Sequence, residues 1–407
     1  MPKSLTQRST SRQGIWVTFL SSSDVMNTQS IAIVGAGLSG IYAAYLLEKA
    51  GVSNYQVLEA SERLGGRIRS EEYRSSRSSE RLDLGAAWFW PHMQPELHDL
   101  VRSLRLKVYA QHEQGAMMVE RSPETAPTRH AGYLSSPPSM RIEGGMLALV
   151  DRLSTSIASE RIHLDRRVTA ISATDAGVTL EVQTGSGEIE YLLADHVLLA
   201  IPPRLAASTI QFMPKLPSNV LDQWHNTATW MARHAKYLAV YSTPFWRDEG
   251  LSGEARSFSG PMGEIHDASL PDGTGALFGF LGVPAHTRKR VSSQTLQRLC
   301  RAQFVRLFGA KAAHPVAEWL VDWSQSSLTA TSADEQSDGQ HPIPPSPRVD
   351  EGPWRTRISG VASEWSQTYP GYVAGAVQAA QAAVHALLAA RTPSSQASSS
   401  IESASPL

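Results

Sequence analysis

The sequence predicts an α/β fold, with a doubly wound, Rossmann-like domain and a discontinuous second domain built on a mixed sheet with helices. An apolar strand at 31–34 runs into a glycine-rich turn, a helix that ends near residue 50 and a second strand at 55–58. A continuous apolar run at 197–201, stopped by two prolines, is typical of a buried parallel strand. Between residues 166 and 193, alternating apolar and polar residues indicate an antiparallel meander.

Length and composition limit the classes of protein. With 407 residues, 42% of them hydrophobic, the chain is long enough for a large core and two domains. A net charge of −1 with interspersed signs favours neither nucleic acid nor an anionic membrane as a partner. The one cysteine, Cys300, leaves no disulfide and no zinc cluster, which suggests a reducing, cytoplasmic location. No apolar run approaches the length of a spanning helix, so no membrane anchor is expected.

The turn after the first strand has the spacing of a dinucleotide site. Gly35 permits the tight turn, Gly37 lets the backbone approach a pyrophosphate, and Gly40 lets the helix pack closely on the strand. The start of the helix offers free N–H groups and the positive end of its dipole to phosphate. Glu59, at the end of the second strand, is placed to accept hydrogen bonds from a ribose hydroxyl. These residues predict a bound dinucleotide and leave NAD and FAD open.

The residues after Glu59 favour FAD. Gly65 and Gly66 allow close passage of the backbone, and Arg67 can reach a second phosphate face. Together with the first turn, the run Ser61-Glu-Arg63-Leu-Gly65-Gly66-Arg67 resembles the FAD fingerprint of the flavin-containing amine oxidases, the monoamine oxidase family and its relatives. Dehydrogenases that bind only NAD usually lack this second turn, so FAD is the expected cofactor.

The C-terminal part carries the other specific part of the resemblance, which spans roughly residues 31–391. Gly371-Tyr372 precedes a long helix that starts at Val373, and in the resembled family this helix start faces the flavin pyrimidine ring. A helix dipole there stabilises the negative charge of reduced flavin. The resemblance implies that Tyr372 is one wall of an aromatic cage and that Glu364 is an acid near the cofactor.

The middle of the chain supplies further candidates by resemblance. Lys236 opens a predicted strand and is followed by Pro244-Phe245-Trp246. In the resembled family a lysine at this distance holds a water against flavin N5, which implies a catalytic role for Lys236 beside Tyr372. The family segment that corresponds to 85–88 passes beside the flavin ring, and Val168 matches a position whose backbone meets adenine.

The predicted site has two catalytic residues, Lys236 and Tyr372, and no metal ligand. The predicted cofactor-binding residues are Gly35, Gly37, Leu38, Ser39, Gly40, Glu59, Ala60, Arg63, Gly65, Gly66, Arg67, Gly85, Ala86, Ala87, Trp88, Val168, Glu364, Gly371, Tyr372 and Val373.

The resemblance also suggests how the flavin is held. Covalently flavinylated monoamine oxidases carry a Cys-Tyr pair shortly after a tryptophan similar to Trp319, and those positions fall at Leu328 and Thr329 here. Because neither is a cysteine, FAD is expected to bind without a covalent link. The missing tyrosine leaves the second wall of the cage unassigned.

The activity implied by the resemblance is that of an FAD-dependent oxidase. It would transfer a hydride from an amine C–H to flavin N5, giving an imine, then a carbonyl product, with molecular oxygen reduced to hydrogen peroxide. Aromatic walls without an anion suit the uncharged amine that this step needs. Two alternatives stay open: a flavin desaturase or porphyrinogen-type oxidase on the same fold, and a flavin-binding scaffold without turnover. Neither the actual amine (monoamine, polyamine or amino acid) nor the oligomeric state is predicted.

The order of these pieces predicts the domain boundaries. The segments expected to form the FAD-binding domain are 31–90, 140–212 and 351–391. The segments expected to form the substrate domain are 91–139 and 213–350. Residues 1–30 are expected to be a disordered extension, and residues 392–407 a disordered tail.

Overall fold

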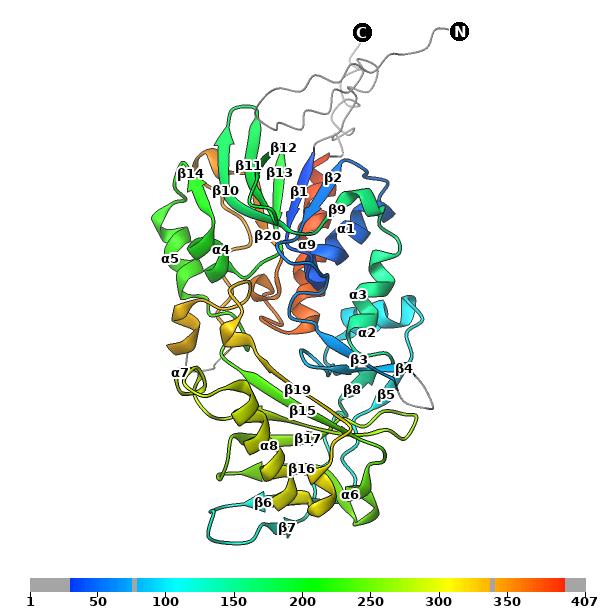
Figure 1. Ribbon diagram of the computed structural model, residues 1–407. Helices are drawn as coiled ribbons and strands as arrows, with labels where there is room; N and C mark the ends of the chain where they lie inside the picture. The colour runs from blue at the N-terminus through cyan, green and yellow to red at the C-terminus, as the bar shows by residue number, and fades with distance from the viewer. Residues whose placement is uncertain (1–29, 75–78, 337–340, 392–407) are drawn as a thin grey trace, which may run out of the picture.

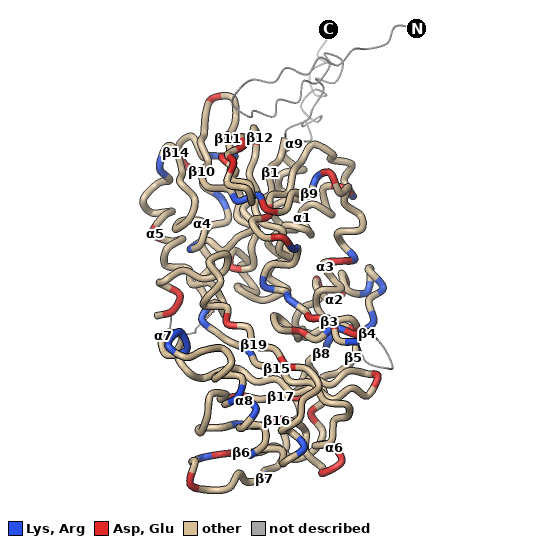
Figure 2. The backbone as a smooth tube through the Cα atoms, in the orientation of Figure 1, with Lys and Arg blue, Asp and Glu red and all other residues tan. Residues whose placement is uncertain are grey.

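The computed structural model describes residues 30–74, 79–336 and 341–391. Figure 1 shows two lobes stacked along the long axis of the molecule, with β1, α1 and α9 in the upper lobe and β15 to β19 in the lower one. The predicted extension, apart from Ser30, and the predicted tail lie outside the described residues. Lys and Arg residues alternate with Asp and Glu residues through both lobes, as Figure 2 shows.

The upper lobe is built on a five-stranded parallel sheet in the order β20-β13-β1-β2-β9. Its strands are β1 (Ile31–Val34), β2 (Tyr55–Leu58), β9 (Ile162–His163), β13 (His196–Leu199) and β20 (Ile358–Gly360). The chain adds strands on both sides of β1, which is the doubly wound arrangement. The predicted Rossmann-like domain and its buried parallel strand are therefore confirmed.

The two faces of this sheet belong to different cores. Ile31 and Ile33 of β1 pack with α1 (Leu38–Lys49), α3 (Leu147–Ser154) and α9 (Val373–Arg391). The intervening residues of β1 face the opposite core, which includes the meander. Because successive side chains of a strand point to opposite faces, a strand that is apolar throughout must be covered on both sides.

Helix α9, the predicted long helix from Val373, is the longest helix of the described chain, and it buries Val377, Ala380 and Val384. By length and composition alone, Val373–Ala390 could cross a membrane. The expectation that the chain holds no apolar run of that length is therefore wrong. In the fold, this helix lies against α1 and contributes its stripe to the core.

The second face of the parallel sheet is covered by a four-stranded sheet in the order β12-β11-β10-β14. Its strands are β10 (Arg166–Thr174), β11 (Gly177–Thr184), β12 (Ile189–Ala194) and β14 (Gln211–Met213). The first three strands pair antiparallel, which confirms the predicted meander. Helices α4 (Pro203–Thr209) and α5 (Ser218–Asn226) lie before and after β14.

The lower lobe is built on a seven-stranded mixed sheet in the order β19-β15-β18-β17-β16-β6-β7. Its strands are β6 (Ala116–Glu120), β7 (Thr128–His130), β15 (Ala235–Tyr241), β16 (Leu251–Ser257), β17 (Met262–Asp267), β18 (Gly275–Leu281) and β19 (Ala317–Asp322). Helix α8 (Ser293–Phe308) packs on this sheet and buries Cys300. Short helices α6 (Phe245–Asp248) and α7 (Ala285–Arg288) complete this lobe.

The two lobes are joined by small elements near the middle of the molecule. These are the hairpin of β3 (Ser70–Arg74) and β4 (Ser79–Asp83), the pair of β5 (Val108–Ala110) and β8 (Met140–Ile142), and α2 (Pro95–Ser103). The prediction placed all of 91–139 in the substrate domain. Instead, Leu97, Leu100 and Val101 of α2 pack into the core of the upper lobe, so the boundary at residue 90 is too early. The rest of the domain division stays a prediction.

Candidate active site

A cavity of about 560 Å³ extends from the first glycine turn of the upper lobe to β15 and β18 of the lower lobe. Almost all of the predicted site residues line it. They are Gly35, Gly37, Leu38, Ser39, Glu59, Ala60, Arg63, Gly65, Gly66, Arg67, Gly85, Ala86, Ala87, Trp88, Val168, Lys236, Gly371, Tyr372 and Val373. Of the predicted residues, Gly40 and Glu364 are not part of the cavity wall.

The first glycine turn leaves room for a ligand at one position and not at another. A Cβ on Gly40 would lie 2.0 Å from the Gly35 carbonyl oxygen, so Gly40 serves helix packing, as predicted. A Cβ on Gly37 would meet no protein atom nearer than the Gly65 carbonyl oxygen at 4.0 Å, because it would point into the cavity. Helix α1 starts at the next residue without a side-chain cap. This cradle and the uncapped helix start fit the pyrophosphate of a dinucleotide.

Glu59 ties the two glycine turns together. Its carboxylate accepts hydrogen bonds from the Ala36 N–H at 2.6 Å, and from the Ser61 N–H and hydroxyl at 2.9 and 2.8 Å. Each carboxylate oxygen can accept a further hydrogen bond, so the predicted ribose contact stays a prediction. Arg63 donates to the carbonyl groups of Gly66 and Ile68 and thereby fixes the second turn.

Arg67 and Glu364 form a bidentate ion pair. The two Nη atoms lie 2.6 and 2.8 Å from the two carboxylate oxygens, and Arg67 also donates to the Ser363 hydroxyl. Burial raises the pKa of Glu364, but the charge and hydrogen bonds of Arg67 outweigh it, so this pKa lies below its ordinary value. Glu364 lies behind the cavity wall and positions Arg67, and its predicted contact with the cofactor stays a prediction.

Lys236 is a buried lysine in the wall of the cavity. It is 2% exposed, and its Nζ donates to the carbonyl oxygens of Asp83 at 2.7 Å and Gly85 at 3.3 Å. Nζ also lies 4.0 Å from the ring centre of Phe278. Burial lowers the pKa of Lys236 from 10.5 to about 7. Lys236 therefore lies directly against the 85–88 segment, which the prediction placed beside the flavin ring.

Aromatic rings gather at the Tyr372 end of the cavity. Trp230 and Tyr372 both line the wall, with ring centres 6.4 Å apart. His341 stacks on both rings at 3.6 and 4.7 Å, and its Nε2 lies 3.0 Å from the Tyr372 hydroxyl. The ring of Trp90 meets Tyr372 edge-on at 6.3 Å. Thr329, at the position of the missing family tyrosine, also lines the wall. The aromatic rings at this end therefore come from other segments of the chain.

The sequence reading did not single out Trp230 or His341. Two residues of the site fix the backbone of Trp230: its backbone N–H donates to Glu364, and its backbone carbonyl group accepts from Arg67. Gly371 is the residue that admits it, since a Cβ there would lie 2.4 Å from the Trp230 Cβ. The available signal was the six-residue spacing between Trp230 and Lys236, which alone does not specify a cage.

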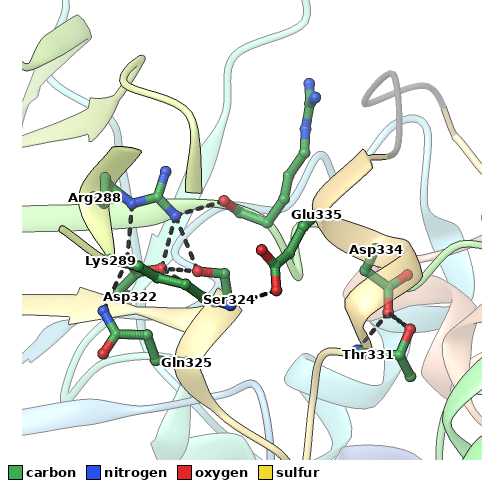
Figure 3. Close-up of polar contacts among 9 residues, drawn as sticks. Arg288, Lys289, Asp322, Ser324, Gln325, Thr331, Asp334 and Glu335 are labelled. Atoms are coloured by element: carbon green, nitrogen blue, oxygen red, sulfur yellow. Dashed lines mark hydrogen bonds and ion pairs between the residues drawn. The ribbon is translucent and has the colours of Figure 1, made fainter. Parts of the chain in front are cut away.

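The stretch 323–329 lines the cavity and is anchored by buried charges (Figure 3). Arg288 donates to both carboxylate oxygens of Asp322 at 2.8 and 2.7 Å, and Ser324 donates its N–H and hydroxyl to the same carboxylate. Lys289 pairs with Glu335, which follows this stretch by six residues. These contacts fix a stretch that has no strand or α-helix of its own.

Asp334 links this stretch to the aromatic rings. One of its oxygens accepts from the Arg204 guanidinium at 2.7 Å and from the Thr229 N–H at 2.9 Å. Its other oxygen accepts from the N–H and hydroxyl of Thr331, as Figure 3 shows. Since Thr229 precedes Trp230, the buried Asp334 carboxylate sets the position of that ring.

One lining residue corrects the expectation of a cavity without an anion. The carboxylate of Glu264 lies in the wall, and its hydrogen bond from His266 lowers its pKa to about 2, helped by Arg256. Arg256 and His266 each lie 2.7 Å from it. Arg256 and His266, on the same sheet, therefore balance the negative charge of Glu264.

Comparisons with known proteins agree with this arrangement. The model of flavin containing amine oxidoreductases matches residues 114–388, more than half of the chain, and that of NAD(P)-binding Rossmann-like domains matches residues 33–104. Putrescine oxidase from Kocuria rosea is 30% identical over 249 residues, which are 57% of this chain and 50% of that protein. A Mycobacterium tuberculosis protein, provisionally named a flavin-containing monoamine oxidase, is 29% identical over 60% of this chain and 51% of its own length.

The chain thus spans about half the length of these curated relatives. Among solved structures, cyclohexylamine oxidase from Brevibacterium oxydans superimposes with a TM-score of 0.72 at 20% identity, covering 89% of this chain and 99% of that one. This likeness shows the fold. From the family match and the fold together, the chain belongs to the family of flavin-containing amine oxidoreductases.

Proposed function

We propose that this chain is an FAD-dependent amine oxidase that binds its flavin without a covalent link and uses molecular oxygen as the electron acceptor. The observation that carries the proposal is Lys236, a buried lysine whose Nζ faces the cavity shared by the glycine turns and Tyr372. A buried lysine held only by carbonyl oxygens and ring faces is costly to a fold. Such a residue points to a role in chemistry.

The glycine turns would hold the dinucleotide part of FAD. Gly37 and the uncapped start of α1 suit the pyrophosphate, and Glu59 suits a ribose. The start of α9 at Val373 directs its positive dipole end at the same cavity. The one cysteine of the chain is buried on α8 in the core of the lower lobe, away from this wall, which supports non-covalent binding.

When bound, the flavin supplies a two-electron acceptor for the C–H bond next to nitrogen. The chain's own residues position the amine and keep water out. Trp230 and Tyr372 offer flat apolar walls that would orient an uncharged amine. Lys236, with its pKa near 7, can hold or release a proton at Nζ and can place a water at the reaction centre. The imine product would hydrolyse to a carbonyl compound, and oxygen would give hydrogen peroxide.

The substrate class proposed is a small amine. Relatives are named for putrescine, for monoamines and for cyclohexylamine, and others for L-amino acids. The aromatic rings support an amine in preference to the large apolar substrates of a desaturase or a porphyrinogen-type oxidase. A cytoplasmic location is proposed from the single cysteine.

The test is a panel of monoamines, diamines and amino acids with the purified yellow protein. We expect at least one amine to bleach the flavin without oxygen and to release one hydrogen peroxide per turnover in air. Bleaching only by substrates oxidised at a carbon–carbon bond would contradict the amine assignment. A flavin that no compound reduces, while dithionite reduces it, would support a scaffold without turnover.

A further inference from the structure

His341 contacts both aromatic rings of the substrate end from outside the cavity. Its ring centre lies 3.6 Å from that of Trp230 and 4.7 Å from that of Tyr372, with interplanar angles of 20° and 19°. Trp230 and Tyr372 line the main cavity, whereas His341 is exposed and is not part of the cavity wall. Any effect of His341 on a bound amine therefore passes through the two rings.

The two ring nitrogens of His341 bridge the turn that precedes α9. Nδ1 lies 3.2 Å from the carbonyl oxygen of Pro370, and Nε2 lies 3.0 Å from the Tyr372 hydroxyl. Because a carbonyl oxygen can only accept, Nδ1 must carry the hydrogen, and in the neutral ring Nε2 is then an acceptor. Burial raises the pKa of Tyr372, so its hydroxyl keeps its proton and donates to Nε2. One tautomer of His341 thus satisfies both contacts.

The backbone that carries His341 is held in place although the side chain is exposed. His341 precedes Pro342, and a residue before proline is restricted to extended backbone conformations. Pro342 and Pro345 are buried, and the Gly360 N–H donates to the Pro347 carbonyl oxygen at 2.8 Å. This stretch is therefore fixed to β20, and the imidazole is fixed with it.

Among the rings around Tyr372, His341 constrains its orientation most. The ring centres of Trp90 and Trp230 lie 6.3 and 6.4 Å from that of Tyr372, and both contacts are between ring surfaces or edges. His341 is nearer, at 4.7 Å, and it adds a hydrogen bond at the far end of the side chain. Because a hydrogen bond weakens steeply when its angle changes, this contact limits rotation of the Tyr372 ring.

We propose that His341 is a positioning residue for amine oxidation, which holds the Tyr372 ring through its hydroxyl at the angle that the bound amine requires. The inference rests on the proposed function, in which Trp230 and Tyr372 orient the amine. A small displacement of such a wall lowers the rate of a reaction that needs close alignment of the reacting atoms. Loss of the contact should therefore slow reduction of the flavin by the amine more than it weakens amine binding.

The test is a double-mutant cycle on the flavin-loaded protein, measured by stopped-flow reduction of the flavin with an amine that the wild type oxidises. His341→Phe keeps a ring for stacking and removes both hydrogen bonds. We expect it to lower the limiting rate of reduction about fivefold, with a smaller change in the Kd of the amine. In a Tyr372→Phe background the same change should have no further effect, because the hydroxyl is already absent.

The matched control is His314→Phe, since His314 is exposed and also precedes a proline. It should alter neither the rate nor the Kd. An unchanged or faster reaction in His341→Phe would overturn the proposal, and so would a fivefold loss that persists in the Tyr372→Phe background. A wild type that no amine reduces would instead refute the proposed function.

A second measurement covers the case that His341→Phe does not fold. In NMR spectra of the histidine ring nitrogens at alkaline pH, we expect His341 to be the tautomer with hydrogen on Nδ1. Its signals are identified by their loss in His341→Gln. A tautomer with hydrogen on Nε2 would overturn the proposal, because that nitrogen could not accept from Tyr372. This readout does not depend on amine oxidation.

Discussion

The two ends of the main cavity are built in different ways. The nucleotide end comes from one continuous stretch, from Gly35 through Glu59 to Arg67, with both turns held by local hydrogen bonds. The substrate end is assembled from separate segments, and it joins Trp230, Thr329 and Tyr372, which are far apart in the sequence. The spacing of residues in the sequence specifies the nucleotide end, whereas the substrate end forms only after the two lobes have packed together. Changes at the first end should therefore affect folding and cofactor, and changes at the second should affect turnover.

The largest effect is expected within the first turn, where substitution of two glycines three residues apart should have opposite consequences. Gly40→Ala places a Cβ 2.0 Å from the Gly35 carbonyl oxygen and should prevent folding of the upper lobe. Gly37→Ala meets no protein atom within contact distance, so the protein should fold but lose flavin. Circular dichroism and flavin content after purification measure the two outcomes. A folded, yellow Gly37→Ala protein would show that this cradle does not hold the pyrophosphate.

At the substrate end, Lys236→Met should have the largest effect. It removes the Nζ that faces the cavity while keeping the length of the side chain. We expect reoxidation of reduced flavin by oxygen to slow about 100-fold, with little change in FAD binding. Stopped-flow absorbance and flavin titration measure these two quantities, and the exposed Lys215→Met is the matched control. Equal losses in both quantities would make Lys236 structural.

Trp230→Ala should have a smaller effect, confined to the substrate. Removing one wall of the aromatic site should lower kcat/KM for a good amine about tenfold, which is about 1.4 kcal/mol. Thr329→Ala, at the position of the missing family tyrosine, removes no ring and should change kcat/KM much less. Steady-state peroxide release compares the two variants. If Thr329→Ala were the more damaging change, Trp230 would not be the second wall.

The last expected effect is a dependence of stability on pH. The folded-state pKa of Lys236 lies near 7 and its unfolded value near 10.5. Between these values the unfolded chain binds a proton that the folded chain does not, so stability should rise with pH. The contribution is at most about 1.4 kcal/mol per pH unit. Urea unfolding of wild type minus Lys236→Met isolates it, and a flat difference between pH 7 and 10 would contradict a neutral buried lysine.

Features that depend on a periodic pattern or on a motif of fixed spacing were predictable. The parallel strands, the meander and α9 follow from apolar periodicity, and Gly37 and Gly40 follow from the spacing of a dinucleotide turn. Lys236 and Tyr372 were found through family resemblance, and the structure places both in one cavity. Each of these predictions depends on residues that are close together in sequence or on a motif that keeps its spacing.

Features made by contact between distant segments were not predictable. Arg67 and Glu364 are 297 residues apart, and neither position shows that its charge is satisfied by the other. Helix α2 was placed in the wrong lobe because its apolar stripe fits either core. Trp230 acquires its position only from Asp334 and Gly371.

The most direct test of the account is a crystal structure of the yellow protein with its bound cofactor. It predicts that the pyrophosphate lies at Gly37 and that the isoalloxazine ring lies between the Gly85 segment and the start of α9, within reach of Lys236 and Tyr372. A colourless protein that takes up no added flavin would contradict it, and so would a ring system bound outside this cavity.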